Sequence, residues 1–215
     1  MCAAISYQSV NGVIMNDYDY MKIAWATRIN AKCVKKLGTC LVTFDGDTIP
    51  GKNGTPQYVT ECVVRYGRCP RENSLSGRDL HLCPSVHAEV EPIIECAKLG
   101  ISTHGSTLYC SFGVPCKDCM KVIIQSDIER LVLTRMTFYD ELSKQLLEDF
   151  KVIGELKILN VVQCPKCFSL NARKIKPHEK IYVAVGVEID REKLLSCTDC
   201  NLTYTPVEDA VYVGD

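Results

Sequence analysis

The sequence predicts a layered α/β domain followed by a small zinc-ribbon-like module. Two observations favour this. Up to about residue 162, segments with apolar residues at helical spacing alternate with short aliphatic runs, a pattern typical of α/β layers. From residue 163 the chain changes to a β-rich stretch that lies between two C-x-x-C pairs. We therefore expect an α/β domain over residues 1–162 and a zinc-ribbon-like module over residues 163–215.

The first half of the expected domain alternates a helix with a strand and then turns irregular. Apolar side chains recur at helical spacing over residues 18–30, and residues 40–44 have the composition of a strand. The run Asp45-Gly46-Asp47 is a turn signal, and residues 52–56 form a second turn-rich stretch. Residues 63–82 are polar and show no clear period, so no element is expected there.

The second half continues the alternation. Gly100 is placed to end a helix, because glycine adopts the left-handed conformation at helix C-termini. We expect helices over residues 86–99, 116–126 and 139–150, and strands over residues 106–111, 130–134 and 157–162.

Charge and hydrophobicity restrict the class of partner. The chain has 215 residues, of which 25 are basic and 26 are acidic, so a strongly basic surface for nucleic acid is absent. No apolar run approaches the ~20 residues that span a membrane. Residues 1–10 lack the charged and apolar regions of a signal peptide. We expect a cytoplasmic protein with no membrane partner.

The 14 cysteines indicate either disulfides or metal-bound thiolates. Two thiolates three positions apart can both reach one tetrahedral zinc ion. This spacing, together with the lack of an export signal, favours zinc. It occurs three times, at Cys116/Cys119, Cys164/Cys167 and Cys197/Cys200.

The last two pairs predict one structural zinc in the C-terminal module, bound by Cys164, Cys167, Cys197 and Cys200. Such a ribbon can dock nucleic acid, and the basic run at residues 173–176 agrees with that. Alternatively, the metal stabilises a β module whose core is too thin to fold alone, or the module packs against a neighbouring subunit.

The first pair belongs to a more informative pattern, in which His87-Ala88-Glu89 precedes Pro115-Cys116-x-x-Cys119. One histidine and two cysteines leave the fourth zinc position open, as in catalytic sites, where a bound water becomes hydroxide near neutral pH. Glu89 stands two residues from a ligand, where a carboxylate can move a proton between that water and a substrate nitrogen. This pattern is the signature of zinc-dependent base deaminases. A purely structural zinc is the alternative.

Beyond the zinc motif, residues 18–160 resemble the deoxycytidylate (dCMP) deaminase family of the cytidine deaminase superfamily. Residues 20–28 resemble the first helix of the family, and residues 38–42 resemble its first strand, usually G-A-x-I-V. The turn at residues 53–56 matches N-G-x-P. One departure is Pro92, which follows H-A-E where the family commonly has Asn-Ala-Ile, and which is tolerated only in a first helical turn.

The resemblance implies a three-layer fold with a five-stranded mixed sheet, helices on both of its faces and a homo-oligomeric assembly. It implies hydrolysis of dCMP to dUMP and ammonia. His87, Cys116 and Cys119 match the ligands of the catalytic zinc, and Glu89 matches the proton shuttle. Asn53 matches a turn residue that contacts the nucleotide, although asparagine also suits the turn itself. Tyr139 loosely matches a substrate-side tyrosine, and a packed core tyrosine is the alternative.

The resemblance also implies a second structural zinc, which many microbial and phage members carry. Its ligands come from before the first strand, just after N-G-x-P, and from the insert before H-A-E. Cys33, Cys62 and Cys83 stand at these places, and Cys69 or His81 is the fourth ligand. The alternative is that some of these are ordinary buried cysteines. The total is then one catalytic zinc and one or two structural ones.

The leading hypothesis is therefore an enzyme that acts on a small nucleotide, dCMP. The first alternative is another cytosine nucleotide, such as dCTP. The second is a base in tRNA or single-stranded DNA, flipped into the site while the ribbon docks the strand. A catalytically inactive binding protein is the third, and Glu89 argues against it because a metal site does not need that carboxylate for its structure.

Overall fold

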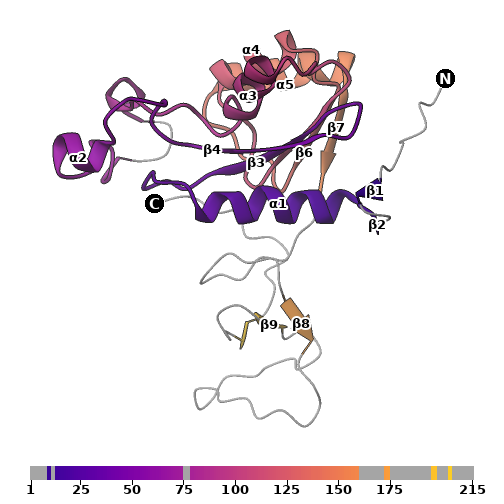
Figure 1. Cartoon of the computed structure of the whole chain (residues 1–215), viewed down its shortest axis with the longest axis horizontal. Helices are drawn as coiled ribbons and strands as arrows, with labels where there is room; N and C mark the ends of the chain where they lie inside the picture. The colour runs from indigo at the N-terminus through magenta and orange to yellow at the C-terminus, as the bar shows by residue number, and fades with distance from the viewer. Residues whose placement is uncertain are drawn as a thin grey trace. The chain divides into compact units, whose positions relative to one another are not determined.

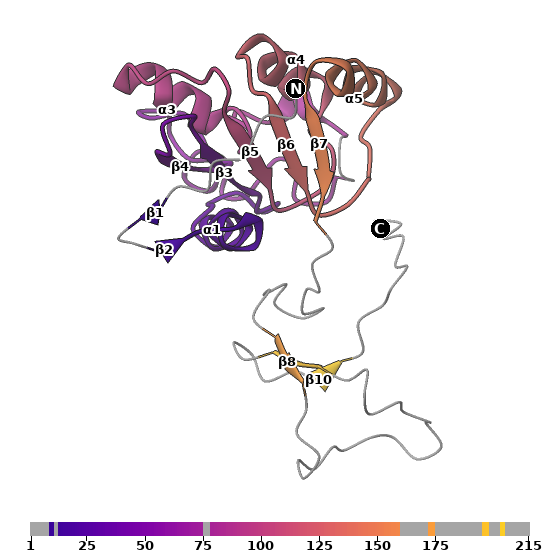
Figure 2. The ribbon, with the colours of Figure 1, turned by 90° about the vertical axis from the view of Figure 1, so that its right-hand side faces the viewer.

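A five-stranded mixed sheet organises the first part of the chain in the computed structural model (Figure 1). The strand order is β4-β3-β5-β6-β7, in which β3 pairs antiparallel with β4 and β5, while β5, β6 and β7 are parallel (Figure 2). This confirms the predicted α/β class. The strands are β3 (Gly38–Val42), β4 (Thr48–Lys52), β5 (Thr107–Cys110), β6 (Arg130–Leu133) and β7 (Glu155–Ile158).

The structure describes residues 9–10, 13–74 and 78–159 and three short strands at residues 172–174, 195–197 and 203–204, with side chains described over residues 15–74 and 78–159. The chain divides into two compact units, Met1–Asn160 and Val161–Asp215. Within the described residues, no helix is both long and apolar enough to cross a membrane.

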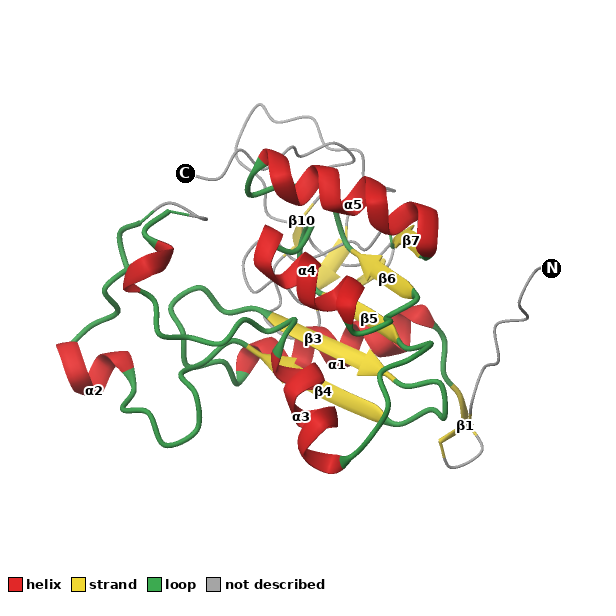
Figure 3. Cartoon of the chain, turned by 90° about the horizontal axis from the view of Figure 1, so that it is seen from above, coloured by secondary structure: helices red, strands yellow, loops and turns green. Residues whose placement is uncertain are grey.

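Helices cover both faces of the sheet, as the resemblance implies. One face packs against α1 (Asp17–Ile29), and the other carries α3 (Glu91–Leu99), α4 (Lys117–Gln125) and α5 (Glu141–Ile153) (Figures 1 and 3). The chain passes through α4 between β5 and β6 and through α5 between β6 and β7, because parallel neighbours need such crossovers. The result is a three-layer unit.

Local sequence explains where α1 begins and how it packs. Asn16 caps the helix, and its side chain accepts the Tyr18 and Asp19 N–H groups. The carboxylate of Asp19 accepts the Asn16 N–H in return, which completes a capping box. Of the residues in the predicted apolar period of α1, Tyr20, Met21, Ala24 and Trp25 are buried, whereas Ile29 at the end of the helix is 57% exposed.

The hydrophobic core lies between the sheet and the helices of the second face. All four residues of β6 are buried, as expected for a strand with parallel neighbours and covered faces. The fully buried core side chains include Leu41, Leu108, Leu131, Leu133, Met120, Ile123, Leu147 and Phe150.

Several predicted boundaries shift. The strand expected at residues 40–44 begins earlier and ends at Val42, and Phe44 beyond it is 71% exposed. The helix expected to end at residue 150 continues to Ile153, and the strand expected at residues 157–162 is β7, which begins already at Glu155. The polar stretch from residue 63 contains two short elements that its pattern does not predict, α2 (Cys62–Tyr66) and the 3-10 helix η1 (Leu80–Leu82).

Short antiparallel strands occur at both ends of the chain. In the first unit, β1 (Ser9–Val10) pairs with β2 (Val13–Ile14). In the second unit, β8 (Ala172–Lys174), β9 (Leu195–Cys197) and β10 (Thr203–Tyr204) form a sheet in the order β10-β9-β8. Of the predicted ribbon ligands, Cys164, Cys167 and Cys200 lie outside the described residues, and Cys197 ends β9 with its side chain not described.

Candidate active site at a histidine-cysteine metal centre

Three potential metal ligands converge at one point of the first unit. The Nδ1 atom of His87 lies 3.5 Å from the Cys116 Sγ atom and 3.2 Å from the Cys119 Sγ atom, and the two sulfur atoms are 3.5 Å apart. Four-coordinate zinc with ordinary bond lengths separates such ligand atoms by about 3.6–3.8 Å. The trio therefore has nearly the dimensions of a zinc site with one position left for another ligand.

The start of α4 positions the two thiols. Cys116 is the N-cap of α4 and has extended backbone angles, while its carbonyl oxygen accepts the Met120 N–H at 2.9 Å. Cys119 lies three residues further along the same helix, so the two side chains share one face. Both cysteines are buried. The C-x-x-C spacing thus places two sulfur atoms on one side of a helix N-terminus.

A short bridge and a turn position His87. Val86 and Gly54 exchange two backbone hydrogen bonds, at 2.8 and 3.2 Å, which tie the segment before His87 to the turn after β4. The His87 carbonyl then accepts the Val90 and Glu91 N–H groups, both at 3.1 Å.

The expectation that a helix runs from residue 86 is wrong, because α3 begins at Glu91. His87 therefore precedes a turn over residues 88–90 rather than opening the helix. The physical reason is Pro92, which has no N–H to bond the carbonyl of Ala88, so the regular series of helical bonds starts later.

Glu89 has the environment of a general acid and base. Its side chain is 1% exposed, and its Oε2 atom has no hydrogen-bond partner among the described residues. Burial, which disfavours the charged form, raises the pKa of Glu89 to about 7. A carboxyl group with such a pKa can accept and donate a proton near neutral pH. An orphaned buried oxygen two residues from a ligand also fits a site that holds a further group.

The charges of the three ligands are coupled. The hydrogen bond between the Cys116 and Cys119 sulfur atoms, reinforced by His87, lowers the pKa of Cys116 to about 4. The hydrogen bond to Cys116 raises the pKa of His87 to about 9, and the same thiolate holds the pKa of Cys119 far above its usual range. The cluster therefore retains protons around one thiolate, and a divalent metal would displace them, because ligands bind metal in their deprotonated forms.

Comparison with known proteins places this geometry in a family. Residues 15–135 match the model of the cytidine and deoxycytidylate deaminase zinc-binding region, and this span contains all three ligands and Glu89. The chain belongs to this family.

Among its relatives, the deoxycytidylate deaminase of Saccharomyces cerevisiae is 33% identical over 138 residues, which are 64% of this chain and 41% of the yeast protein. The human deoxycytidylate deaminase is 27% identical over 106 residues, which are 49% of this chain and 56% of the human protein. The matched regions thus span about two fifths to just over half of these relatives' own lengths.

Among solved structures, the dCMP deaminase of cyanophage S-TIM5 in complex with dCMP and dUMP is similar to this chain. The two are 25% identical with a TM-score of 0.51, and the match covers 66% of this chain and 95% of the phage chain. The likeness therefore covers most of the first unit of this chain.

The structure gives Asn53 a clear local role. Its side-chain oxygen accepts the Leu37 N–H at 2.8 Å, and its amide nitrogen donates to the Lys35 carbonyl at 2.5 Å. Asn53 therefore fixes the loop before β3 against the turn after β4. Tyr139, the other expected substrate contact, lies in the connection between β6 and α5 and is 37% exposed.

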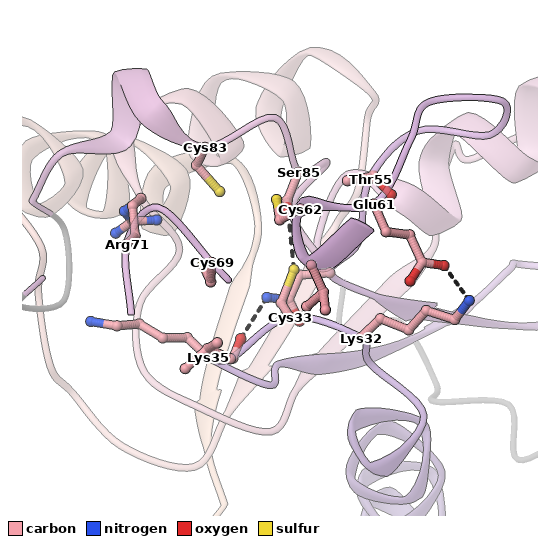
Figure 4. A pocket seen from close by; sticks show the side chains of 13 residues that line it. Lys32, Cys33, Lys35, Thr55, Glu61, Cys62, Cys69, Arg71, Cys83 and Ser85 are labelled. Carbon is pink, nitrogen blue, oxygen red and sulfur yellow. Dashed lines mark hydrogen bonds and ion pairs between the residues drawn. The ribbon is translucent and has the colours of Figure 1, made fainter. Parts of the chain in front are cut away.

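The predicted ligands of the second structural zinc gather elsewhere, around one pocket. Cys33, Cys62, Cys69 and Cys83 all line it (Figure 4), and we call it the four-cysteine pocket. His81, the alternative ligand, lies in η1, is exposed and does not line the pocket. The four cysteines that the sequence analysis groups across residues 33–83 therefore line one pocket, and their role as zinc ligands stays a prediction.

The four thiols are less tightly clustered than the first site. Among the residues with described side chains, three potential ligand atoms lie within 4.8 Å of one another only at His87, Cys116 and Cys119. The four cysteines of the pocket do not meet this criterion. The thiol of Cys33 lies 3.0 Å from the Ser85 hydroxyl. Although burial opposes it, hydrogen bonds from Ser85 and the Arg71 guanidinium lower the pKa of Cys83. Burial raises the pKa of Cys33 and of Cys62, so among these three thiols only Cys83 is shifted towards the thiolate form.

The basic residues beside this pocket were not identified from sequence. Lys32, Lys35 and Arg71 line it together with the thiols. Arg71 is 9% exposed and its Nε atom donates to the Arg78 carbonyl at 2.8 Å, while Lys35 donates to the Ser74 carbonyl at 2.5 Å. Arg71 lies in the polar stretch without periodicity, and Lys32 and Lys35 lie in the loop between α1 and β3, so no periodic pattern marks them.

Proposed function

We propose that the chain is a zinc-dependent deaminase that hydrolyses deoxycytidylate to dUMP and ammonia. The observation that carries this is the buried Glu89 carboxyl group, whose Oε2 atom has no hydrogen-bond partner among the described residues, beside three converged ligand atoms. Membership of the cytidine and deoxycytidylate deaminase family supports it, as do relatives named deoxycytidylate deaminase. A solved neighbour in complex with dCMP and dUMP supports the choice of nucleotide.

His87, Cys116 and Cys119 would hold the zinc ion. When bound, zinc supplies a Lewis acid that makes water a nucleophile near neutral pH. The ligands fit this role because their three atoms have the spacing of a tetrahedral site with one open position. The burial of Cys116 and Cys119 limits access of bulk water, which strengthens electrostatic interactions inside the site.

Glu89 would move the protons of the reaction. Its carboxylate takes a proton from the attacking water and delivers it to the N3 atom of the cytosine ring. As the C4–N4 bond breaks, Glu89 takes the remaining hydroxyl proton and transfers it to the leaving amine. One water is consumed and one ammonia leaves, so the carboxylate returns to its starting state. A pKa of about 7 suits a group that must act as base and then as acid.

The near-zero charge of the chain supports a small nucleotide over nucleic acid, because phosphate-backbone binding needs a clustered basic surface. Asn53 can contact the nucleotide in addition to holding the loop. Its side-chain amide has two N–H groups, and only one of them is used in the hydrogen bond to the Lys35 carbonyl. Tyr139 stays a prediction for the same substrate.

We further propose a structural zinc in the four-cysteine pocket, with Cys69 rather than His81 as the fourth ligand. The gathering of four thiols around one pocket supports this choice. A zinc bound by Cys164, Cys167, Cys197 and Cys200 stays the prediction for the C-terminal module.

The test is a substrate panel. The purified full chain is loaded with zinc and incubated with dCMP, dCTP, deoxycytidine, cytidine and cytosine-containing oligonucleotides, and ammonia release is measured. We expect the highest kcat/KM with dCMP. Preference for dCTP or for an oligonucleotide would replace the proposed substrate, and no ammonia from any of them would refute the proposed reaction.

A further inference from the structure

The carbonyl group of Ala88 lacks the partner that a regular helix would give it. Ala88 lies between His87 and Glu89, so its carbonyl belongs to the backbone that joins a metal ligand to the proposed proton shuttle. In a continuous helix this oxygen would accept the N–H of residue 92. That residue is Pro92, which has no N–H. The helical pattern therefore has a gap at this oxygen.

Helical hydrogen bonds precede this segment at His87 and resume at Val90. The Glu91 N–H donates to the His87 carbonyl at 3.1 Å, and the Ile94 N–H donates to the Val90 carbonyl at 3.0 Å. Ala88 itself is fully buried. A buried carbonyl without a partner is destabilising, because it has lost its hydrogen bond to water. The gap must be filled from outside the helix.

Thr39 fills it. The Thr39 hydroxyl donates to the Ala88 carbonyl oxygen at 2.6 Å, and Thr39 is fully buried in β3. Its neighbour across the ladder is Gly51 of β4. A Cβ atom at Gly51 would lie 2.5 Å from both the Ala88 oxygen and the Pro92 Cδ atom, so only glycine leaves room for this approach.

We propose that Thr39 is a positioning residue that replaces the hydrogen bond removed by Pro92 and so fixes His87 and Glu89 relative to each other. The strand that carries Thr39 is a rigid support, because β3 is hydrogen-bonded to β4 on one side and to β5 on the other. α3 packs over β3 and β4, which brings the turn against this strand (Figure 3). The catalytic part of the inference rests on the proposed function, whereas the structural part does not.

The first test removes the hydroxyl. Thr39→Val keeps the branched shape, and Thr39→Ser keeps the donor. Because small displacements of a catalytic group lower turnover steeply, we expect Thr39→Val to lower kcat for dCMP about tenfold with a smaller change in KM. Thr39→Ser retains most of the activity. Thr43→Val is the matched control, since Thr43 is buried just beyond the same strand and its hydroxyl accepts the Asp47 N–H.

The second test measures the metal without measuring turnover. Groups that orient metal ligands contribute to metal affinity, so Thr39→Val should weaken zinc retention against a chelator about tenfold. The absorption of the cobalt-substituted protein reports the geometry of the thiolate ligands and should change in Thr39→Val but not in Thr43→Val. Equal zinc retention and an unchanged cobalt spectrum in Thr39→Val would overturn the proposal.

The third test is a double-mutant cycle with Pro92→Ala, which returns an N–H to the Ala88 oxygen. In metal-free protein, Thr39→Val should raise the unfolding equilibrium constant about tenfold. The same change should have little effect in the Pro92→Ala background, because the backbone N–H replaces the hydroxyl. If Thr39→Val destabilises the wild-type and the Pro92→Ala protein equally, the hydroxyl does not replace the missing N–H and the proposal is refuted. A loss of stability in Thr39→Ser as large as in Thr39→Val would refute it too.

The double-mutant cycle remains informative if Thr39→Val does not fold. If Thr39→Val alone is unfolded, folding of the double variant supports the exchange of one donor for another, and its failure contradicts it. A wild-type chain that releases no ammonia would contradict the proposed function alone, since the cycle reads only stability.

Discussion

The ion pair between Asp17 and Arg130 links the start of α1 to the first residue of β6. Two guanidinium N–H groups of Arg130 donate to the two Asp17 carboxylate oxygens at 2.8 and 2.9 Å. The Tyr109 hydroxyl and the Lys157 ammonium donate to the same carboxylate at 2.8 and 2.6 Å. The side chains of Arg130 and Asp17 are 10% and 16% exposed, so this pair is largely desolvated.

Asp17→Asn should therefore destabilise the protein strongly. Removing one partner of a buried pair costs about 3–5 kcal/mol, because the other charge stays buried. Glu155 still pairs with Arg130 at 3.0 Å, so the lower end, about 3 kcal/mol, is expected. For a protein of this size that corresponds to a decrease in Tm of about 6–12 °C. Glu148→Gln is the control, because its exposed pair with Lys151 should contribute under about 1 kcal/mol.

The pH dependence follows from the same contacts. Hydrogen bonds from Arg130 hold the pKa of Asp17 well below its usual range, although burial opposes the shift. A carboxyl group with a depressed folded-state pKa stabilises the fold above its unfolded-state pKa of about 4, and this contribution decreases as the pH falls below that value. The stability difference between wild type and Asp17→Asn should therefore be constant from pH 5 to pH 7 and narrow towards pH 3.

Urea unfolding, followed by circular dichroism from pH 3 to pH 7, measures both effects. A loss in Asp17→Asn no larger than in Glu148→Gln would refute the assignment of a buried, stabilising pair. A stability difference that does not depend on pH would refute the role of the Asp17 charge.

Two further predictions concern metal. Cys116→Ser should lose the catalytic zinc and all deaminase activity. The control is Cys110→Ala, which removes a buried thiol that is not a predicted ligand and should keep both zinc and activity. Metal analysis and an ammonia assay measure the two properties in each variant. Cys33→Ser should lower the zinc content by one ion per chain while leaving the His87 site loaded, and an unchanged zinc content would exclude Cys33 as a ligand.

The sequence predicted the α/β alternation and the grouping of His87, Cys116 and Cys119 for physical reasons, and the resemblance implied the five-stranded sheet. Helical period and strand composition are local properties, so α1, α4 and α5 were placed within a few residues. The residues of H-x-E and of P-C-x-x-C are so close in the chain that local backbone geometry determines the relative orientation of their side chains. The structure confirms the five-stranded mixed sheet and brings His87, Cys116 and Cys119 together.

The features that the sequence did not predict are very short elements or contacts between residues far apart in the chain. α2 has five residues, too few to show a helical period. The hydrogen bond between Thr39 and Ala88 joins positions 49 apart, and no pattern in either segment marks it. The choice of Cys69 over His81 in the four-cysteine pocket depends on how an aperiodic loop folds. A homo-oligomer, a cytoplasmic location and the ribbon zinc stay predictions.

The most direct test of the central claim is the turnover of Glu89→Gln with dCMP at equal zinc content. Glutamine has nearly the same shape but cannot carry a proton, so the account predicts at least a ~100-fold loss of kcat with zinc retained. Glu95→Gln is the matched control, because Glu95 lies on α3, pairs with Lys98 and has a side chain that is 44% exposed, and the activity of this variant should equal that of wild type. Near-normal turnover by zinc-loaded Glu89→Gln would contradict the account.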